Sequence, residues 1–470
     1  MKQFTYKMNG MQQFLMKLAA VAGLTLPLAA YGVESSAESA ASGAGAPSAS
    51  QTASDAKTVD NSWQFYGQAT YVDQYHPAFS AAYSGAYSLD PASSNNETAD
   101  ITLFAGHRLW NGAEFWINPE IDQGFGLSNT LGIAGFSSGE AYKIGANAPY
   151  LRVPRAFVRQ VFNLGGEAQN VEAGVNQVAG TTNANNVTLT VGKFSVVDIF
   201  DTNTYAHDPR SDFLNWSLVD GGSFDYAADS WGFTNGLAVE WNQGSWTLRG
   251  GAFQMSEVPN SKVSGLHLHQ YELVTELEER HQWLDHPGKL KLLTFVNRGD
   301  MANYTDAVQW GLVNAATPDV SQVRKFSSNP GMVLNFEQEI TSDLGIFARA
   351  SANSGKKEAY EFTDINRSLS AGFTLQGNGW GRANDKLGLA GVVNALSGDA
   401  RTYFADGGLG ILIGDGALNY GREQIVEAFY SAQLCDKVKL TADYQRVVNP
   451  GYNQDRGPVS VYALRLHAEY

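Results

Sequence analysis

The last twelve residues of the chain, 459–470, read VSVYALRLHAEY. Small or polar residues alternate there with Tyr462, Leu464, Leu466, Ala468 and Tyr470. A period of two is the spacing of a β-strand, because successive side chains of a strand point to opposite faces. Chain ends usually fray in water. An amphipathic strand that reaches the terminal side chain therefore indicates that its apolar edge meets a surface other than water.

The same period of two dominates from Ser62 onward. Residues 101–122 and 231–253 read as hairpins, because alternating strands flank Asn111-Gly112 and the turn sequence NQGS. Residues 271–283 have the charged composition of a helix, but their apolar and acidic residues alternate, which favours a strand.

Charged residues inside these strands separate two all-β interpretations. A soluble sandwich also alternates, but its inner face is apolar. Here formal charges recur on the polar faces, and Trp, Phe and Tyr recur near strand ends, as in the aromatic girdles of membrane barrels. The charged positions are Arg108, Glu114, Glu120, Arg155, Arg159, Glu240, Arg249, Arg349 and Arg465. We therefore expect a closed antiparallel transmembrane β-barrel with a polar lumen and an apolar outer face, since an open edge in lipid is costly.

The length of the chain sets the size of this barrel. Residues 61–470 accommodate sixteen strands of about 10 residues, with short turns at one end and long extracellular loops at the other. Fourteen or eighteen strands also fit this length. Barrels of this size leave an aqueous channel, whereas eight strands would be filled by side chains.

The N-terminal region predicts export. Lys2, Lys7 and Lys17 precede an apolar run too short to span a bilayer, and Ala30-Tyr31-Gly32 follows it, so residues 1–32 read as a signal peptide. The Ala/Ser-rich residues 33–60 read as a flexible leader. One cysteine excludes an intrachain disulfide, and a net charge of −15 argues against a nucleic-acid partner.

Four longer stretches carry a family resemblance, namely residues 192–216, 223–260, 343–377 and 449–470. Together they resemble the carbohydrate-selective porins of the OprB type. The resemblance implies a sixteen-stranded barrel of the Gram-negative outer membrane that passes neutral sugars passively, glucose-like monosaccharides first. The chain departs from the family in ending on Tyr470 where Phe is more usual, which keeps an aromatic side chain at that position.

A selective porin needs a narrow constriction whose groups replace part of the hydration of a sugar and then release it. Residues 196–216 are too polar and irregular for a membrane strand, and we expect them to fold inward as a constriction loop. Arginine and carboxylate side chains offer charge-assisted hydrogen bonds to hydroxyls. Each candidate also has a structural interpretation, either as a salt bridge that braces the wall or, for Asp, as a turn residue. The candidates are Arg108, Glu114, Arg155, Arg159, Asp198, Asp201, Asp208, Arg210, Trp216, Glu240 and Arg249.

Other chemistry finds little support. His267 and His269 share a strand face, but two ligands make no metal site, so we expect no metal and no cofactor. A non-selective porin, or less readily an enzyme or adhesin on a similar barrel, is the alternative function. We expect sugars, outer-membrane lipid, lipopolysaccharide and the barrel-assembly machinery as partners. That machinery would read the terminal strand through Tyr462, Leu464, Leu466 and Tyr470.

Overall fold

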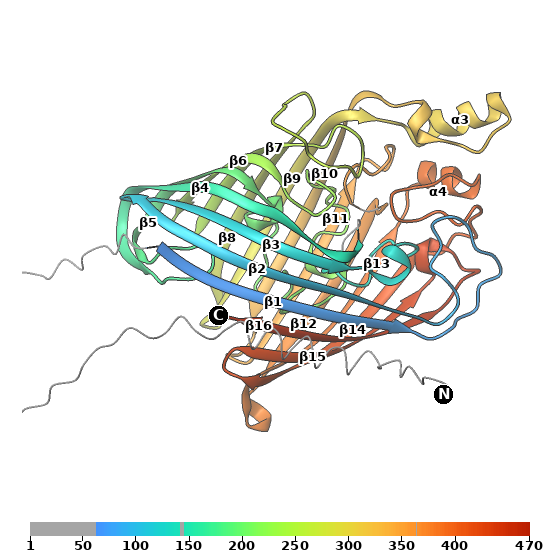
Figure 1. The fold of residues 1–470 in the computed structure, drawn as a ribbon. Helices are drawn as coiled ribbons and strands as arrows, with labels where there is room; N and C mark the ends of the chain where they lie inside the picture. Colours follow the sequence, from blue (N-terminus) through green and yellow to red (C-terminus); the bar gives the residue numbers. More distant parts are fainter. Residues whose placement is uncertain (1–62, 142–144, 363) are drawn as a thin grey trace, which may run out of the picture. The chain divides into compact units, whose positions relative to one another are not determined.

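The computed structural model describes residues 63–141, 145–362 and 364–470, and within them sixteen antiparallel strands close into one barrel (Figure 1). This confirms the predicted fold class and selects sixteen strands over fourteen or eighteen. The predicted signal peptide and leader lie outside the described residues. The strands are β1 (Trp63–His76), β2 (Ser94–Trp110), β3 (Ala113–Gly124), β4 (Ala146–Val171), β5 (Gly180–Phe194), β6 (Thr234–Gln243), β7 (Trp246–Gln254), β8 (Tyr271–Trp283), β9 (His286–Met301), β10 (Lys325–Glu339), β11 (Leu344–Asn353), β12 (Arg367–Gly377), β13 (Arg382–Ala395), β14 (Glu423–Cys435), β15 (Val438–Val448) and β16 (Val459–Glu469).

The predicted local elements are present. The two hairpins are β2–β3 and β6–β7, and the charged segment 271–283 is strand β8. Short helical segments occupy the connections, and in the described part of the chain every helix is too short or too polar to cross a bilayer. They are η1 (Leu127–Asn129), η2 (Val196–Asp198), α2 (Trp216–Val219), α3 (Tyr304–Asn314), η3 (Val320–Gln322), η4 (Asn378–Trp380), α4 (Gly398–Ala405) and η5 (Pro450–Tyr452).

The barrel closes between its first and last strands. Strand β1 pairs with β16 from Gln68↔Glu469 to Tyr75↔Tyr462. Beyond the last pair, the Tyr470 amide donates to the Gly67 carbonyl over 2.8 Å, and the Gly67 amide donates to the Tyr470 carbonyl over 2.9 Å. No edge is left open at this seam, as the hydrocarbon phase requires.

The alternation of β16 answers the question raised by the terminal sequence. Val461 and Ala463 are buried toward the lumen, whereas Tyr462 and Leu464 are 49% and 53% exposed on the outer face. Exposed aromatic side chains gather at both ends of the strands, where a membrane barrel meets the two interfaces. Those at the end with short turns include Trp63, Trp110, Trp283 and Trp380, and those at the opposite end include Tyr75, Phe326, Tyr444 and Tyr462.

The two ends of the barrel differ in their connections. Tight turns such as 111–112, 244–245 and 284–285 join strands at one end, and long connections alternate with them at the other. Outer-membrane barrels have short periplasmic turns and long extracellular loops, which orients this barrel. Helices α3 and α4 lie in the long connections, beyond the strand ends in Figure 1.

The longest connection, residues 195–233 between β5 and β6, enters the lumen, which confirms the expected inward loop. Its second half is buried almost without interruption. Together with residues 125–141 it forms an apolar core inside the barrel. That core includes Phe136, Phe157, Trp216, Tyr226, Phe253 and Phe362.

Candidate channel constriction

Asp201 fixes the first half of the 195–233 loop to the part of the barrel wall formed by β10 and β11. Its carboxylate is fully buried and accepts hydrogen bonds from Asn335 Nδ2 at 2.7 Å and Arg349 Nε at 3.2 Å, on β10 and β11. The same carboxylate accepts the Gly221 amide at 2.6 Å, which ties the two arms of the loop together. A buried carboxylate needs such partners, because an uncompensated charge is strongly destabilising in the interior.

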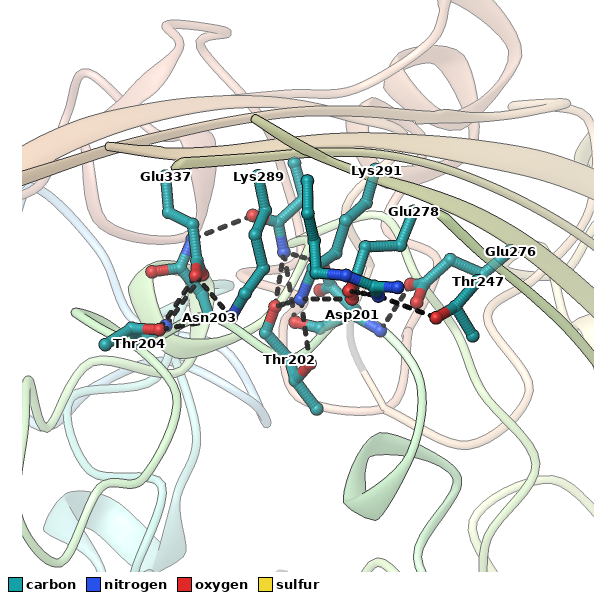
Figure 2. A network of polar contacts seen from close by, with 12 residues as sticks. Asp201, Thr202, Asn203, Thr204, Thr247, Glu276, Glu278, Lys289, Lys291 and Glu337 are labelled. Atoms are coloured by element: carbon teal, nitrogen blue, oxygen red, sulfur yellow. Dashed lines mark hydrogen bonds and ion pairs between the residues drawn. The ribbon is translucent and has the colours of Figure 1, made fainter. Parts of the chain in front are cut away.

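The neighbouring loop residues continue this attachment (Figure 2). Thr204 donates from its amide and hydroxyl to Glu337 at 2.8 and 2.7 Å, and Lys289 pairs with the same carboxylate at 2.7 Å. Glu276 accepts the Asp201 amide at 2.8 Å. Glu276 is also bound by Arg249 at 2.6 Å, and Arg249 contacts Glu278 at 3.0 Å and Glu240 at 2.9 Å. The predicted candidates Glu240 and Arg249 therefore belong to a charge network that braces the wall beside the loop.

The middle of the loop reaches the opposite wall. Arg210 lies within 3.1 Å of Glu140 and 3.4 Å of both Asp100 and Glu120. Burial alone would raise the pKa of Asp212, but Lys386 at 2.6 Å outweighs burial and holds that pKa below its usual value. Arg465 on β16 donates to the Pro209 and Asp212 carbonyls at 2.6 and 2.8 Å. The loop thus crosses the lumen from wall to wall.

Arg155 and Asp198 meet where the loop leaves β5. Arg155 Nη2 and Nε donate to the two Asp198 oxygens at 2.6 and 2.8 Å, which is the bidentate geometry of strong Arg–carboxylate pairs. Burial acts to raise the pKa of Asp198, but the Arg155 guanidinium more than compensates and lowers that pKa below its usual value. Both groups stay charged, and the Asp198 side chain keeps 26% of its surface accessible.

Aromatic side chains flank this ion pair. The guanidinium carbons of Arg155 and Arg152 lie 4.8 and 5.1 Å from the centre of the Phe233 ring. Trp231 donates from Nε1 to the Tyr150 hydroxyl at 2.9 Å, and its ring is 5.9 Å from Arg152. The guanidinium groups on the inner surface of β4 therefore lie against ring faces from the end of the 195–233 loop.

A second ion pair involves β4 near the short-turn end of the barrel, where this strand runs beside the start of β3. Arg159 donates to Glu114 at 2.7 Å and to the Asn176 carbonyl at 2.8 Å. Glu114 also accepts the Val178 amide at 2.7 Å, and Arg108 donates to the Ala179 carbonyl. These three predicted candidates thus hold the β4–β5 connection against the barrel. On the β8–β10 side of the barrel, a cavity of about 310 Å³ is lined by residues that include Tyr205, Arg280, Lys289 and Glu337.

The structure brings some candidates together and separates others. Arg155 and Asp198 are in direct contact, and Arg210 is linked to Glu120, which also pairs with Arg152. Asp208 has a local role, since its side chain accepts the Arg210 amide at 2.9 Å. Trp216 is stacked between Phe136 and Phe362, with ring centres 5.3 and 4.7 Å away, so both faces of its indole are covered. His267 pairs with Glu257 at 3.0 Å, while His269 stacks on Phe326.

Sequence reasoning missed Arg152, Tyr150, Trp231 and Phe233 as lumen residues. Strict alternation places Arg152 on the face opposite Arg155. The register of β3 and β4 shifts between the pairs Asn118↔Arg155 and Glu120↔Arg152, so a β-bulge returns Arg152 to the inner face. Pro154 lies inside this bulge and Pro119 lies opposite it on β3, and both are sequence signals for it, because proline in a strand favours bulges and edges.

Comparison with known proteins decides the family. The model of the carbohydrate-selective porin, OprB family, matches residues 86–470. The chain belongs to the OprB family. A structure titled as the high-pH form of Pseudomonas putida OprB is similar in fold, with a TM-score of 0.67 at 15% identity, covering 87% of this chain and 94% of that one. The outer-membrane channel DcaP of Acinetobacter baumannii covers 87% of this chain and 97% of its own, with a TM-score of 0.49 and 11% identity. A search of curated proteins gave no match.

As a member of the OprB family, the chain is a carbohydrate channel of the outer membrane that works by passive diffusion. Its barrel crosses the membrane with strands, and the 195–233 loop narrows the lumen. Family and fold identify a channel rather than an enzyme.

Proposed function

We propose that this porin prefers neutral, hexose-sized sugars, with glucose-like monosaccharides first. The observation that carries the proposal is that three guanidinium groups along the channel wall are paired with carboxylates. Arg155 faces Asp198, Arg159 faces Glu114, and Arg210 faces three acids. A wall on which each of these arginines is paired with at least one carboxylate offers hydrogen-bonding groups with a weakened local field, which suits an uncharged polar solute better than an ion.

The chemistry of the wall supports a sugar as that solute. Charged donors and acceptors give hydroxyl groups hydrogen bonds that replace lost hydration, and a wet pore keeps each of them weak enough for release. The ring of Trp231 lies beside Arg152, where it would cover the apolar C–H face of a pyranose. We assign Arg155, Asp198, Arg210 and Trp231 to substrate contact, and Arg108, Glu114, Arg159, Asp201, Glu240 and Arg249 to bracing.

Swelling of liposomes that contain the purified porin tests this proposal. Isotonic hexoses, disaccharides and amino acids of matched size are compared. We expect glucose to enter several times faster than a charged amino acid of similar mass. Equal rates for all solutes of one size would favour the alternative of a non-selective porin.

A paired substitution separates contact from bracing. If Arg155 contacts sugar, Arg155→Ala weakens the block of ion current by glucose, whereas Arg159→Ala leaves that block unchanged. Arg159→Ala should alter ion preference alone, because it leaves Glu114 without its guanidinium. Unchanged sugar block in Arg155→Ala would remove Arg155 from the contact set.

We also infer that the terminal strand is read by the barrel-assembly machinery, and that lipid and lipopolysaccharide surround the outer face. The exposed side chains of Tyr462, Leu464 and Tyr470 support both inferences, because they form a continuous apolar edge on β16. No hydrolytic activity is expected; release of sugar or fatty acid from glycan or lipid by the purified porin would contradict that expectation.

A further inference from the structure

A row of cations lies on the outer face of the barrel at its long-loop end. Arg367 begins β12 and pairs with Ala395, which ends β13. The last pair between β13 and β14 is Asn394↔Glu423. Arg422 precedes Glu423 and therefore lies beside Ala395. Two strand spacings separate Arg367 from Arg422, roughly 10 Å between their Cα atoms. The small side chain of Ala395 lies between them.

Alternation shows that these side chains face outward. Ser368 and Glu423 point into the barrel and are buried, whereas their neighbours Arg367 and Arg422 are exposed. Arg401 on α4 adds a third exposed guanidinium. It donates to the Leu396 carbonyl and lies 3.8 Å from the Tyr420 ring, between the end of β13 and the start of β14.

None of these three guanidinium groups forms an ion pair with a carboxylate of the described residues. By contrast, Arg324 and Arg456 in other long connections are paired with Glu358 and Asp415. These three exposed arginines, at or beside the long-loop ends of β12, β13 and β14 and without ion-pair partners in the described part of the chain, form a site of uncompensated positive charge.

The surface next to this row is apolar. Leu369, Val393 and Val426 lie further along β12, β13 and β14, with exposed fractions of 61%, 37% and 49%. They belong to the outer set that meets hydrocarbon. A ligand here therefore meets guanidinium groups at one end and an alkyl surface at the other, which is the chemistry of a phosphorylated lipid.

We propose that Arg367, Arg401 and Arg422 bind a phosphate group of an outer-leaflet lipid whose acyl chains lie on Leu369, Val393 and Val426. Arginine suits this role, since its planar fork binds phosphate oxygens in pairs and basic clusters at membrane surfaces attract anionic headgroups. The inference deepens the proposed contact with lipopolysaccharide and rests on the extracellular orientation of the long loops. It is independent of which sugar passes through the channel.

Native mass spectrometry of the purified full-length porin in detergent tests the site. The probe is bis-phosphorylated lipid A, compared with chemically dephosphorylated lipid A of the same acylation. The variant Arg367→Gln with Arg422→Gln removes two charges on the outer face. The control, Lys262→Gln with Arg298→Gln, removes the same charge from the long-loop end of the β7–β9 sector.

We expect wild type and control to retain phosphorylated lipid A, and the Arg367→Gln/Arg422→Gln variant to lose roughly tenfold or more in apparent affinity. Wild type should bind dephosphorylated lipid A with a low apparent affinity. That affinity should equal the affinity of the Arg367→Gln/Arg422→Gln variant for phosphorylated lipid A. Equal binding by variant and control would overturn the proposal. Displacement of the lipid by millimolar inorganic phosphate would also overturn it, because the site would then take a free anion.

Glucose-driven liposome swelling by the same variant shows that the barrel is intact. Its rate should match wild type, since both arginines face away from the lumen. If the variant does not insert, the single exchange Arg422→Gln, outside β14, replaces it with a smaller expected loss of a few-fold. Swelling that fails to discriminate among solutes would refute the sugar preference without touching the lipid site.

Discussion

Arg155 on β4 and Asp198 on the inward loop face each other through two hydrogen bonds, of 2.6 and 2.8 Å. The pair joins the wall of the barrel to the element that narrows it. It is also the point where two opposite charges are presented to the channel at one place. Substitutions that separate these charges should therefore change both ion preference and sugar passage.

Removing one partner of this pair should give opposite ion preferences. Arg155→Met leaves the Asp198 carboxylate and should favour cations, whereas Asp198→Asn leaves the guanidinium and should favour anions. Reversal potentials in a salt gradient measure both. The double variant should return close to wild-type ion preference while sugar block stays weakened. An unchanged reversal potential in both single variants would place the pair outside the conducting path.

Asp201→Asn should widen the channel. The substitution removes a buried carboxylate from Arg349 and weakens the attachment of the loop to β10 and β11, a loss of about 3–5 kcal/mol by analogy with other buried pairs. We expect larger single-channel conductance and entry of trisaccharides in liposome swelling. Asp208→Asn is the matched control, because Asp208 is exposed and has only a local contact. Wild-type conductance in Asp201→Asn would show that other contacts suffice to hold the loop.

The Tyr470 side chain should matter for assembly more than for the stability of the finished barrel. Tyr470→Phe keeps the ring that lies 4.5 Å from Lys437 Nζ, and should insert normally. Tyr470→Asp costs about 0–1 kcal/mol near an interface, so a large defect would reflect recognition during insertion. The amount of heat-modifiable barrel in outer-membrane fractions measures it. Equal amounts for Asp and Phe variants would contradict this prediction.

The contact between two extracellular loops should weaken as pH rises. Asp364 accepts the Ile411 amide at 2.9 Å, and its burial raises the pKa to about 7 despite that bond. Asp225 and Glu358 add to the rise. The folded state thus holds a proton that the unfolded state releases near its ordinary pKa of 3.8. The stabilisation is complete below about pH 4 and is lost as pH rises to about 7.

Hydrogen exchange of residues 398–415, corrected for intrinsic rates, measures this effect. We expect greater protection at pH 5 than at pH 8 in wild type. Asp364→Asn should be equally protected at both values, because its amide does not titrate. Protection that rises with pH in wild type would reverse the sign and refute the assignment to Asp364.

The N-terminal prediction has a direct check. If residues 1–32 are a signal peptide, the intact mass of the porin from outer membranes should correspond to a chain that begins at Val33. A mass that retains Ala30-Tyr31-Gly32 would remove the argument for export based on this segment.

The outer face and the strands were predictable because alternation and turn chemistry are local. The inward direction of Glu114, Arg155, Arg159 and Arg249 followed from them. The partners of these side chains did not, because they depend on the path of a loop that crosses the lumen. Strict alternation would put Arg152 on the outer face, but a β-bulge adds a residue there and turns its side chain inward. Trp216 suggested a sugar platform, but its stacking on Phe136 and Phe362 arises from the folding of two distant connections.

The apolar core around Trp216 lies inside a barrel whose outer face is itself apolar. The hydrophobic effect in water therefore stabilises the apolar core inside the barrel. The strands themselves are stabilised by the surrounding lipid and by backbone hydrogen bonds that close around the barrel. Urea weakens the hydrophobic stabilisation of the core and leaves the backbone pairing of the barrel in lipid largely intact. We expect the inward loop to unfold before the barrel. In moderate urea the protein would form a wide, unselective channel that still resists detergent. Dilution of the urea would restore selectivity without a new round of membrane insertion.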